Sequence, residues 1–357
     1  MNILQIAPIV LPIIPNMKYG GTERIVLLLD KEFTKLRHNS LVGATGNSDL
    51  QGKLIPTLDK SMWEIKWGSS HEFKEEYEEH FSKILEYSIE NKVEVIHDHT
   101  GRILQSNAYQ RLKNQLDPII ITLHGTLHIE RKREIYETYN DKPKGVYFNA
   151  ISKSQKEQFS QIVPIKEVIY HGIELEKYPF SNENEDYLFS LGRIADFKGQ
   201  HTAIEVAKKL GKRLVIAGNV HPVNQEYFDK EIKPHIDNEQ IRYIGELTDE
   251  EKVPWYQGAS CFLMPINWEE PFGLVMIESM GCGTPVVAFN RGSVKEVIEN
   301  GKTGYVVENQ DLEGMIEAVR NINNIKPKDC RARVEKYFTS SIEAQNYLNL
   351  YNNILNS

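Results

Sequence analysis

The sequence contains little cysteine and no long hydrophobic run. Its three cysteines, at positions 261, 282 and 330, show no paired spacing, so we expect neither a disulfide framework nor a thiolate zinc site. This composition fits the reducing cytoplasm best. No stretch approaches the ~18 apolar residues of a membrane span, and the proline-interrupted N-terminal segment lacks a basic leader. We therefore expect neither a membrane span nor a signal peptide.

Basic residues are also fewer than acidic ones. The chain has 42 lysines and arginines against 50 aspartates and glutamates, which gives a net charge of −8. A chain of this charge offers no electrostatic reason to bind nucleic acid. An anionic ligand would need a local group of basic side chains.

With 357 residues, the chain exceeds the size at which one hydrophobic core usually stops growing, so two domains are expected. Short apolar, β-branched runs alternate with longer helix-like segments, which predicts the α/β class with doubly wound, Rossmann-like parallel sheets. A polar stretch with glycine and proline interrupts this pattern. We place the first domain at 1–176, the second at 177–338 and a last helix within 339–357. The predicted strands lie in “NILQIAP”, “SLVGAT”, “VEVIHDH”, “PIIITLHG”, “GVYFNAIS”, “DYLFSLGR”, “RLVIAGN”, “IRYIGE”, “CFLMPI”, “PVVAFN” and “GYVVEN”.

Open parallel sheets bind ligands beyond the carboxyl ends of their strands. In “LGRIADFKG”, Arg193 and Lys198 follow such a strand and precede a helix. Together they could clamp a diphosphate, the arginine with a planar fork and the lysine as a point charge. The alternative is a solvated basic turn.

The stretch “NWEEPFGLVMIES” places two carboxylates around a Pro-Phe-Gly corner. Gly273 allows close approach, and the residues after it start a helix whose free N–H groups suit a phosphate. Glu278 would lie about 7 Å along this helix, where it could accept hydrogen bonds from ribose hydroxyls. Glu270 sits at the corner, where a sugar beyond the phosphates would lie. The alternative is a helix-dipole role for Glu270 and an exposed helical position for Glu278.

Other segments give weaker signals. Ile244, in “YIG” at a strand end, could form a wall for a planar base, and the alternative is a mainly structural role. Gly20 and Gly21 come before a helix that could face the same anion. His124 ends a predicted strand, and it either faces the ligand or is a buried structural histidine. The “HDHT” segment at 97–100 offers too few ligands for a metal site, so no metal is expected.

These segments together resemble glycosyltransferase family 4, the retaining nucleotide-sugar transferases of the GT-B fold. The resemblance covers nearly the whole chain and is most specific in “EEPFGLVMIESMGCGTPVVA”, which matches the family's E-x7-E signature through Glu270 and Glu278. One departure is His171-Gly172, where the family often has Asn-Gly. The resemblance implies two domains facing across a cleft, with the last helix packed on the first domain.

The resemblance also implies roles for most of these candidate residues. Arg193, Lys198 and Gly21 would contact the diphosphate, and Glu278 would contact the ribose. Glu270 would contact the donor sugar together with the backbone of Phe272, Gly273, Leu274 and Val275, and His124 would contact the transferred sugar near its reacting carbon.

The expected reaction moves a hexosyl group from a nucleotide sugar, with uridine the first choice and guanosine the second, to an acceptor hydroxyl. No metal or other cofactor is expected. The acceptor is a carbohydrate, a lipid-linked or a small molecule. A basic segment at 127–136 could meet an anionic acceptor or a membrane surface, or be a solvated helical face. A hydrolysing nucleotide-sugar 2-epimerase and a non-catalytic nucleotide-sugar-binding protein stay open as alternatives.

Overall fold

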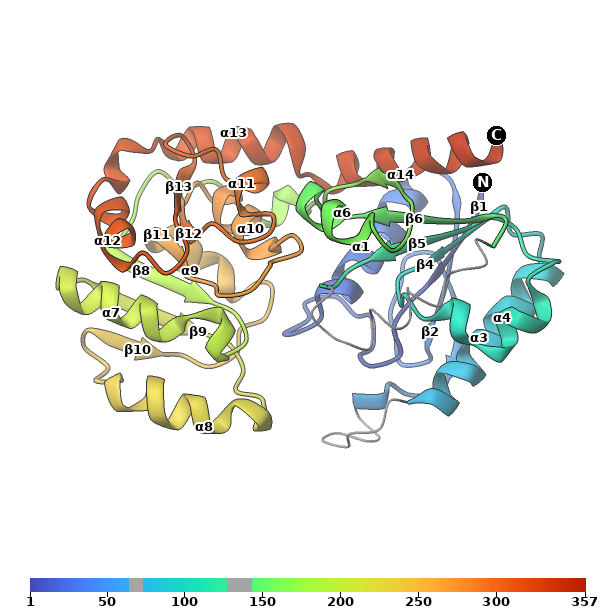
Figure 1. The fold of residues 1–357 in the computed structure, drawn as a ribbon, viewed down its shortest axis with the longest axis horizontal. Helices are drawn as coiled ribbons and strands as arrows, with labels where there is room; N and C mark the ends of the chain where they lie inside the picture. Colours follow the sequence, from blue (N-terminus) through green and yellow to red (C-terminus); the bar gives the residue numbers. More distant parts are fainter. Residues whose placement is uncertain (64–72, 127–142) are drawn as a thin grey trace. The chain divides into compact units, whose positions relative to one another are not determined.

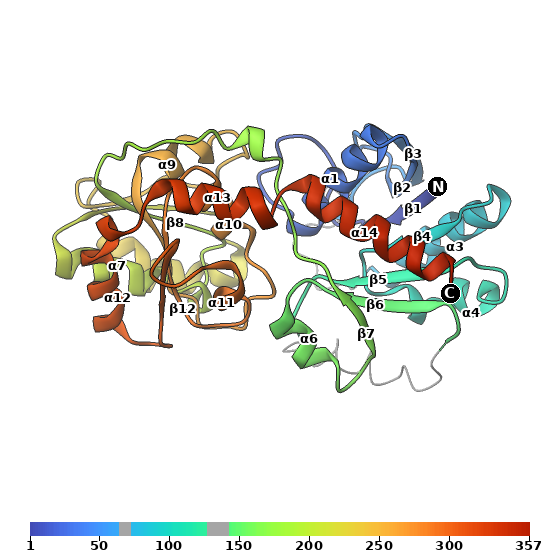
Figure 2. The ribbon, with the colours of Figure 1, turned by 90° about the horizontal axis from the view of Figure 1, so that it is seen from above.

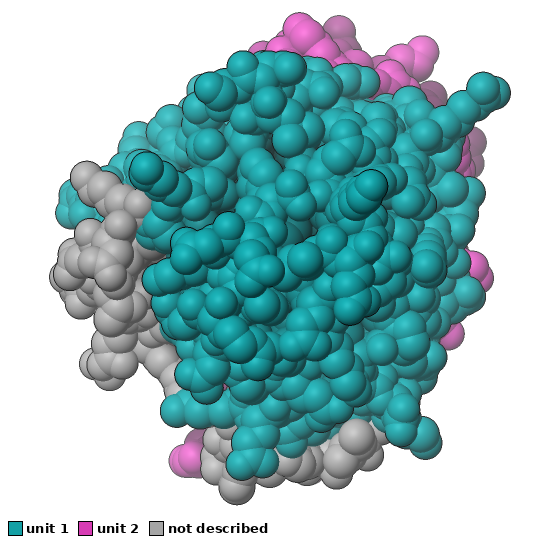
Figure 3. All heavy atoms as spheres, turned by 90° about the vertical axis from the view of Figure 1, so that its right-hand side faces the viewer, with its two compact units in different colours: residues 1–171, 340–357 teal, residues 172–339 magenta. Residues whose placement is uncertain are grey.

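The computed structural model describes residues 1–63, 73–126 and 143–357. The basic segment at 127–136 therefore lies outside the described residues. The chain divides into two compact units, shown in different colours in Figure 3. Unit 1 comprises residues 1–171 and 340–357, and unit 2 comprises residues 172–339. The division falls between His171 and Gly172, whereas the boundary expected from the sequence lies after residue 176.

Unit 1 contains a seven-stranded sheet in the order β3-β2-β1-β4-β5-β6-β7, in which every pair is parallel. The strand order reverses at the β1–β4 pair. The five strands predicted in this part of the chain are confirmed, and two further strands flank them. The strands are β1 (Asn2–Ile6), β2 (Asn39–Thr45), β3 (Lys53–Leu58), β4 (Val95–Asp98), β5 (Ile119–Leu123), β6 (Val146–Ala150) and β7 (Ile165–Val168).

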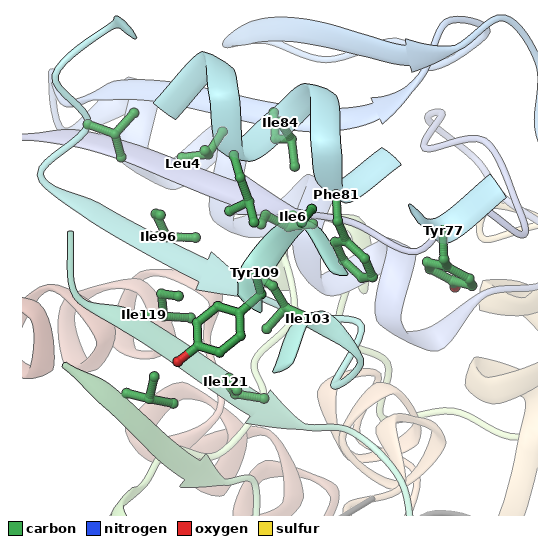
Figure 4. Close-up of a cluster of buried hydrophobic side chains, with 14 of the residues drawn as sticks. Leu4, Ile6, Tyr77, Phe81, Ile84, Ile96, Ile103, Tyr109, Ile119 and Ile121 are labelled. Atoms are coloured by element: carbon green, nitrogen blue, oxygen red, sulfur yellow. The ribbon is translucent and has the colours of Figure 1, made fainter. Parts of the chain in front are cut away.

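Helices cover both faces of this sheet (Figures 1 and 2). The side chains of α3 pack into a cluster with Ile96 of β4 and with alternate residues of β1 and β5, shown in Figure 4. The opposite face of β2 packs against α1 through a second cluster that includes Val26, Leu27 and Val42. The described helices of this unit are α1 (Gly21–Lys35), α3 (Lys74–Glu90), α4 (Asn107–Leu112), α6 (Lys153–Phe159) and α14 (Ser340–Leu355), with 3-10 turn η1 (Ile103–Gln105).

The last helix, α14, belongs to unit 1. Tyr351 packs edge-on against Phe33 of α1, with ring centroids 6.0 Å apart. Ser340 Oγ donates a hydrogen bond of 2.7 Å to Glu32 Oε1, also on α1. The amphipathic helix expected near the end of the chain is thus present, and it completes the core of the unit that contains the first residues.

Unit 2 contains a six-stranded parallel sheet in the order β10-β9-β8-β11-β12-β13. All six strands predicted for this part are confirmed, and the order reverses at the β8–β11 pair. The strands are β8 (Tyr187–Leu191), β9 (Arg213–Ala217), β10 (Ile241–Tyr243), β11 (Ala259–Met264), β12 (Val286–Phe289) and β13 (Gly304–Val307). The longer helices are α7 (Gln200–Leu210), α9 (Lys252–Gly258), α10 (Leu274–Gly281), α12 (Leu312–Arg320) and α13 (Pro327–Tyr337).

Shorter helical turns connect these elements of unit 2. They are η3 (Leu175–Lys177), η4 (Asp196–Lys198), η5 (Pro222–Asn224), α8 (Gln225–Tyr227), the π-helical turn η6 (Phe228–Ile232), η7 (Lys233–His235), α11 (Val294–Val297) and η8 (Ile322–Asn324). The reversal of strand order between β8 and β11 brings the loops after these two strands together at one edge of the sheet, where open α/β sheets bind ligands. In the part of the chain that is described, no helix is both long and apolar enough to cross a membrane.

Candidate active site

The loops after β8 and β11 are locked to each other in unit 2. Gly199 has a φ of 72°, and a Cβ there would clash with the carbonyl oxygen of Pro265. Asn267 N–H donates a hydrogen bond of 2.8 Å to the carbonyl oxygen of Phe197. Only glycine tolerates both this φ and this close approach. The two loops therefore form one rigid corner beyond the carboxyl ends of the strands.

This corner brings Lys198 and Glu270 together, although 72 positions separate them in the sequence. Lys198 Nζ lies 2.9 Å from Glu270 Oε2. The indole Nε1 of Trp268 donates to the same oxygen at 3.0 Å. Lys198 Nζ also lies 4.4 Å from the centroid of the Trp268 ring, within the range of a cation–π interaction. The side chains of the ion pair are only 22% and 10% exposed, so solvent screens the pair weakly.

The loop after β12 fixes the backbone of the second loop. A Cβ at Gly292 would clash with the carbonyl oxygen of Glu270, and Ser293 N–H donates to that oxygen at 3.0 Å. Glu269 points to the same loop, because its Oε2 accepts from Gly292 N–H at 2.7 Å and its Oε1 lies 3.1 Å from Arg291. The two adjacent acids thus have separate partners, and Glu270 alone reaches Lys198.

Helix α10 begins directly after the corner. Gly273 is its N-cap residue, with a φ of 81°, and Leu274 and Val275 are half-buried. The first N–H groups of a helix have no partner within it, so this end offers donors to an anion. The Phe272 side chain is buried and packs against Phe338, with ring centroids 5.9 Å apart. Phe272 therefore offers only its backbone to a ligand.

Glu278 is the fifth residue of α10, and it is 3% exposed. The alternative in which it is an exposed helical acid is therefore wrong. Lys252 Nζ lies 2.7 Å from its Oε1, and the Tyr256 hydroxyl donates to its Oε2 at 2.9 Å. Lys252 also contacts Asp249 at 2.8 Å. Burial, reinforced by the Glu278 charge, raises the pKa of Tyr256 well above its usual value, so the phenol stays a hydrogen-bond donor.

Sequence reasoning missed Trp268, Lys252 and Tyr256. A signal for the last two exists, because Lys252 and Tyr256 are four residues apart and share one face of α9. Trp268 lies two positions before Glu270 in the sequence. Nothing in the local pattern shows that its N–H bonds to that carboxylate.

Arg193 and Ile244 occupy the ends of two other strands in unit 2. Arg193 is half-buried in the loop after β8, and its carbonyl oxygen accepts from the Gln200 side chain at 3.0 Å. Ile244 is half-buried just after β10, and its N–H donates to the carbonyl oxygen of Ile216 at 3.0 Å. Both positions lie at the carboxyl edge of the sheet, as their places in the sequence predict.

In unit 1, Gly20 is the N-cap residue of α1, with a φ of 116°, and Gly21 is the first residue of the helix. Glu23, in the first turn, is almost fully buried, and its carboxyl oxygen lies near Gly20. Burial raises the pKa of Glu23 to about 7. The start of this helix therefore carries a carboxyl group that is partly neutral near pH 7.

His124 directly follows β5 and is half-buried, so it is not a core histidine. Its Nε2 lies 3.0 Å from Nδ1 of the buried His99. Its ring stacks on that of His171, with centroids 5.2 Å apart. His171 Nδ1 in turn lies 2.8 Å from Oε1 of the buried Glu343 on α14. His124 is thus supported on two sides by buried side chains of unit 1.

His97 connects the sheet of unit 1 to α14 through a hydrogen-bond network whose direction follows from donor counting. Thr122 Oγ1 donates to Asn149 Oδ1 at 2.7 Å and therefore accepts from His97 Nε2 at 2.6 Å. His97 Nδ1 then accepts from the Tyr351 hydroxyl at 2.6 Å. Burial is the main cause that holds the pKa of His97 well below its usual value, so the ring is neutral. Among the described residues, no group of three or more histidine, cysteine or acidic side chains could hold a metal ion.

The chain is similar to known glycosyltransferases in sequence and in fold. Residues 174–338 match the family described as Glycosyl transferases group 1. The glycogen synthase of Mycobacterium tuberculosis is 31% identical over 164 residues, which cover 43% of this chain and 39% of that protein. The match therefore spans about two fifths of the length of that relative.

Solved structures superpose on almost the whole chain. Sucrose-phosphate synthase from Thermosynechococcus elongatus has a TM-score of 0.81 at 17% identity and covers 99% of this chain and 98% of its own. The structure of Anabaena Alr3699/HepE in complex with UDP has a TM-score of 0.75 at 17% identity, with coverage of 99% and 100%. The fold is therefore GT-B, with two Rossmann-like units, as the sequence predicts. The family match thus covers most of unit 2, and the GT-B fold extends over both units.

Proposed function

We propose that this chain is a retaining, metal-independent glycosyltransferase of family 4 that moves a hexosyl group from a nucleotide sugar, with UDP as the first choice of nucleotide, to an acceptor hydroxyl. The observation that carries the proposal is the Lys198–Glu270 pair beside the N-terminus of α10, with the buried Glu278 one turn further along the same helix. The UDP complex of the structural neighbour HepE supports the choice of uridine.

The chemistry of unit 2 suits a donor with a diphosphate and two sugars. Each carboxylate oxygen of Glu278 has a second lone pair beyond its contact with Lys252 or Tyr256, so it can also accept a hydrogen bond from a ribose hydroxyl. Lys198 and the first N–H groups of α10 offer positive charge to the diphosphate, and we assign Arg193 to the same role. Glu270 is assigned to the hydroxyls of the donor sugar.

In a reaction without a metal, protein groups must stabilise the leaving diphosphate. Preorganised donors aimed at developing charge are the main source of such stabilisation. We favour a front-side displacement in which the leaving phosphate accepts the acceptor proton, over a covalent enzyme intermediate. We assign His124 to the transferred sugar and Gly20 and Gly21 to the diphosphate. The acceptor is a carbohydrate, a lipid-linked or a small molecule, and the reaction is placed in the cytoplasm.

The test is a panel of nucleoside diphosphates and nucleotide sugars, screened first for thermal stabilisation, because a ligand bound only by the folded state raises apparent stability. Ligands that bind are then offered with acceptor sugars, and products are analysed by mass spectrometry and by NMR at the anomeric carbon. A product with retained configuration is expected. Conversion of the donor without an acceptor would favour the 2-epimerase, and binding without turnover would favour the non-catalytic protein.

The same assay tests metal independence and the diphosphate clamp. Turnover should survive an excess of EDTA, and loss of activity that magnesium or manganese restores would contradict the proposal. Lys198→Ala should lower kcat by about 100-fold or more, because it removes a charge aimed at the leaving group. Near-normal turnover of the Lys198→Ala variant would exclude this role.

A further inference from the structure

We propose that Trp268 is a positioning residue, which holds Glu270 in place when the donor diphosphate draws Lys198 away. This inference rests on the proposed function. Glu270 Oε2 accepts from two donors, Lys198 Nζ at 2.9 Å and Trp268 Nε1 at 3.0 Å. The two donors differ in kind, because one is a mobile charge and the other is a neutral N–H on a fixed ring.

The difference between the donors matters when an anion arrives. An ammonium group on a flexible stem is attracted by a diphosphate and can share its three N–H donors between two acceptors. A carboxylate beside a diphosphate is repelled, and its hold on Lys198 weakens as the phosphates compete. The indole N–H carries no net charge, so the phosphates do not draw it away. It leaves Glu270 Oε2 anchored in the loaded site.

The surroundings of Trp268 fix the direction of this N–H. The Trp268 ring packs against Phe197, with centroids 5.3 Å apart. The adjacent Asn267 N–H donates to the Phe197 carbonyl oxygen at 2.8 Å, which ties the backbone of this loop to the loop that carries Lys198. The ring therefore has little freedom to turn, and its N–H points to Glu270 before any ligand binds.

Trp268 contacts the ion pair through two separable parts. The N–H contacts Glu270, and the ring face contacts Lys198, whose Nζ lies 4.4 Å from the ring centroid. Trp268→Phe removes the N–H and keeps an aromatic face. Trp268→Leu removes both. The two variants therefore distinguish support of Glu270 from support of Lys198.

The experiment measures the affinity for UDP by calorimetry and the kinetics with the nucleotide sugar that the wild type uses. Trp268→Phe should leave the UDP affinity within about twofold of the wild type and lower kcat/KM about tenfold, the size expected for one hydrogen bond to a charged acceptor. Trp268→Leu should weaken UDP binding as well, because Lys198 loses the ring beneath it. An unchanged kcat/KM in Trp268→Phe would overturn the proposal.

A double-mutant cycle with Glu270→Ala shows whether Trp268 acts through Glu270, because alanine leaves no acceptor for the indole N–H. If it does, Trp268→Phe should have almost no further effect in the Glu270→Ala background. Losses that multiply would mean that the indole acts elsewhere, and they would overturn the proposal. Trp255→Phe on α9 makes the same chemical change away from the pair, and it should behave as the wild type.

Two further measurements keep the outcome clear. If Trp268→Phe is poorly folded by circular dichroism, replacement of Trp268 with benzothienylalanine removes the N–H while keeping the shape of the ring, and the same predictions apply to it. A wild-type protein that neither binds nor turns over any nucleotide sugar would contradict the proposed function itself. Turnover by the wild type with no change in either Trp268 variant would contradict only the role of Trp268.

Discussion

Glu270 and Glu278 have the same side chain but different partners, and this difference predicts different ligand dependence. Glu278→Gln should weaken the binding of UDP about tenfold, since the amide replaces one acceptor for ribose with a donor. Glu270→Gln should leave UDP binding unchanged or slightly tighter, because Lys198 loses its competing partner. The same variant should weaken the part of the donor affinity that the sugar contributes. Calorimetry with UDP and with the full donor separates the two effects.

The choice of glutamine rather than alanine follows from the burial of Glu278. Glutamine keeps a side-chain oxygen that can accept from the buried Lys252 Nζ, whereas alanine would remove this acceptor altogether, and loss of one member of a buried pair is strongly destabilising. Equal losses for both ligands in both glutamine variants would show that the two acids are not divided between the ends of the donor.

At this scale, the sequence predicts some site residues and not others for a clear reason. Lys198, Glu270 and Glu278 stand next to glycine corners and helix starts, which are local signals. The spacing of Lys252 and Tyr256 is a local signal that they share a helix face, but only the fold shows their partner, through the 2.7 Å contact between Lys252 and Glu278 across 26 positions. A pattern within one segment cannot show a partner from another.

At the scale of elements, α14 is held to the sheet of unit 1 by polar contacts as well as by apolar packing. Tyr351→Phe removes the donor to His97 Nδ1 and leaves that buried nitrogen without its 2.6 Å partner. Unit 1 should lose about 1–3 kcal/mol of stability, the usual cost of a buried group left unsatisfied. Urea unfolding monitored by hydrogen exchange in β4 and β5 measures the loss.

Tyr337→Phe is the matched control for this prediction. Tyr337 lies at the end of α13 in unit 2 and is 42% exposed, so removal of its hydroxyl should leave the stability of unit 1 unchanged. If Tyr351→Phe proves as stable as Tyr337→Phe, the network does not hold α14 in place.

The strands that sequence reasoning missed are also explained at this scale. β3 and β7 are the two edge strands of the unit 1 sheet. β3 contains Pro56, and β7 reads Ile-Lys-Glu-Val with no buried residue. Edge strands lack the continuous apolar run of a strand buried on both faces, and natural proteins place charge and proline on them. The central strands carry the apolar run, so the pattern predicts them.

At the scale of the whole molecule, the two units should respond differently to acid. In unit 1, burial lowers the pKa of His80 to about 3 and holds those of His97 and His99 well below their usual value. These rings stay neutral in the folded state but gain protons in the unfolded state below about pH 6.5. The unfolded state then binds more protons, so each ring lowers the stability as pH falls.

Two buried acids of unit 1 act in the opposite direction. Burial raises the pKa of Glu23 to about 7 and that of Asp98 to about 6. Between these values and their ordinary values, the folded state holds protons that the unfolded state has released. Each acid therefore raises the stability as pH falls through this range. Three histidines against two acids leave a net excess of about one proton in the unfolded state.

Unit 1 should therefore lose about 1.4 kcal/mol of stability between pH 6 and pH 5, which corresponds to one proton over one pH unit. Glu23→Gln mimics the neutral acid at every pH, removes one opposing group and should roughly double this loss. In unit 2 the buried groups with shifted pKa values are tyrosines and cysteines, which stay neutral here, so that unit serves as an internal control. Denaturant unfolding with hydrogen exchange at both pH values measures the two units separately. A unit 1 that becomes more stable at pH 5 would show that the histidines are not held neutral. A Glu23→Gln variant with no steeper loss would show that the pKa of Glu23 is not raised.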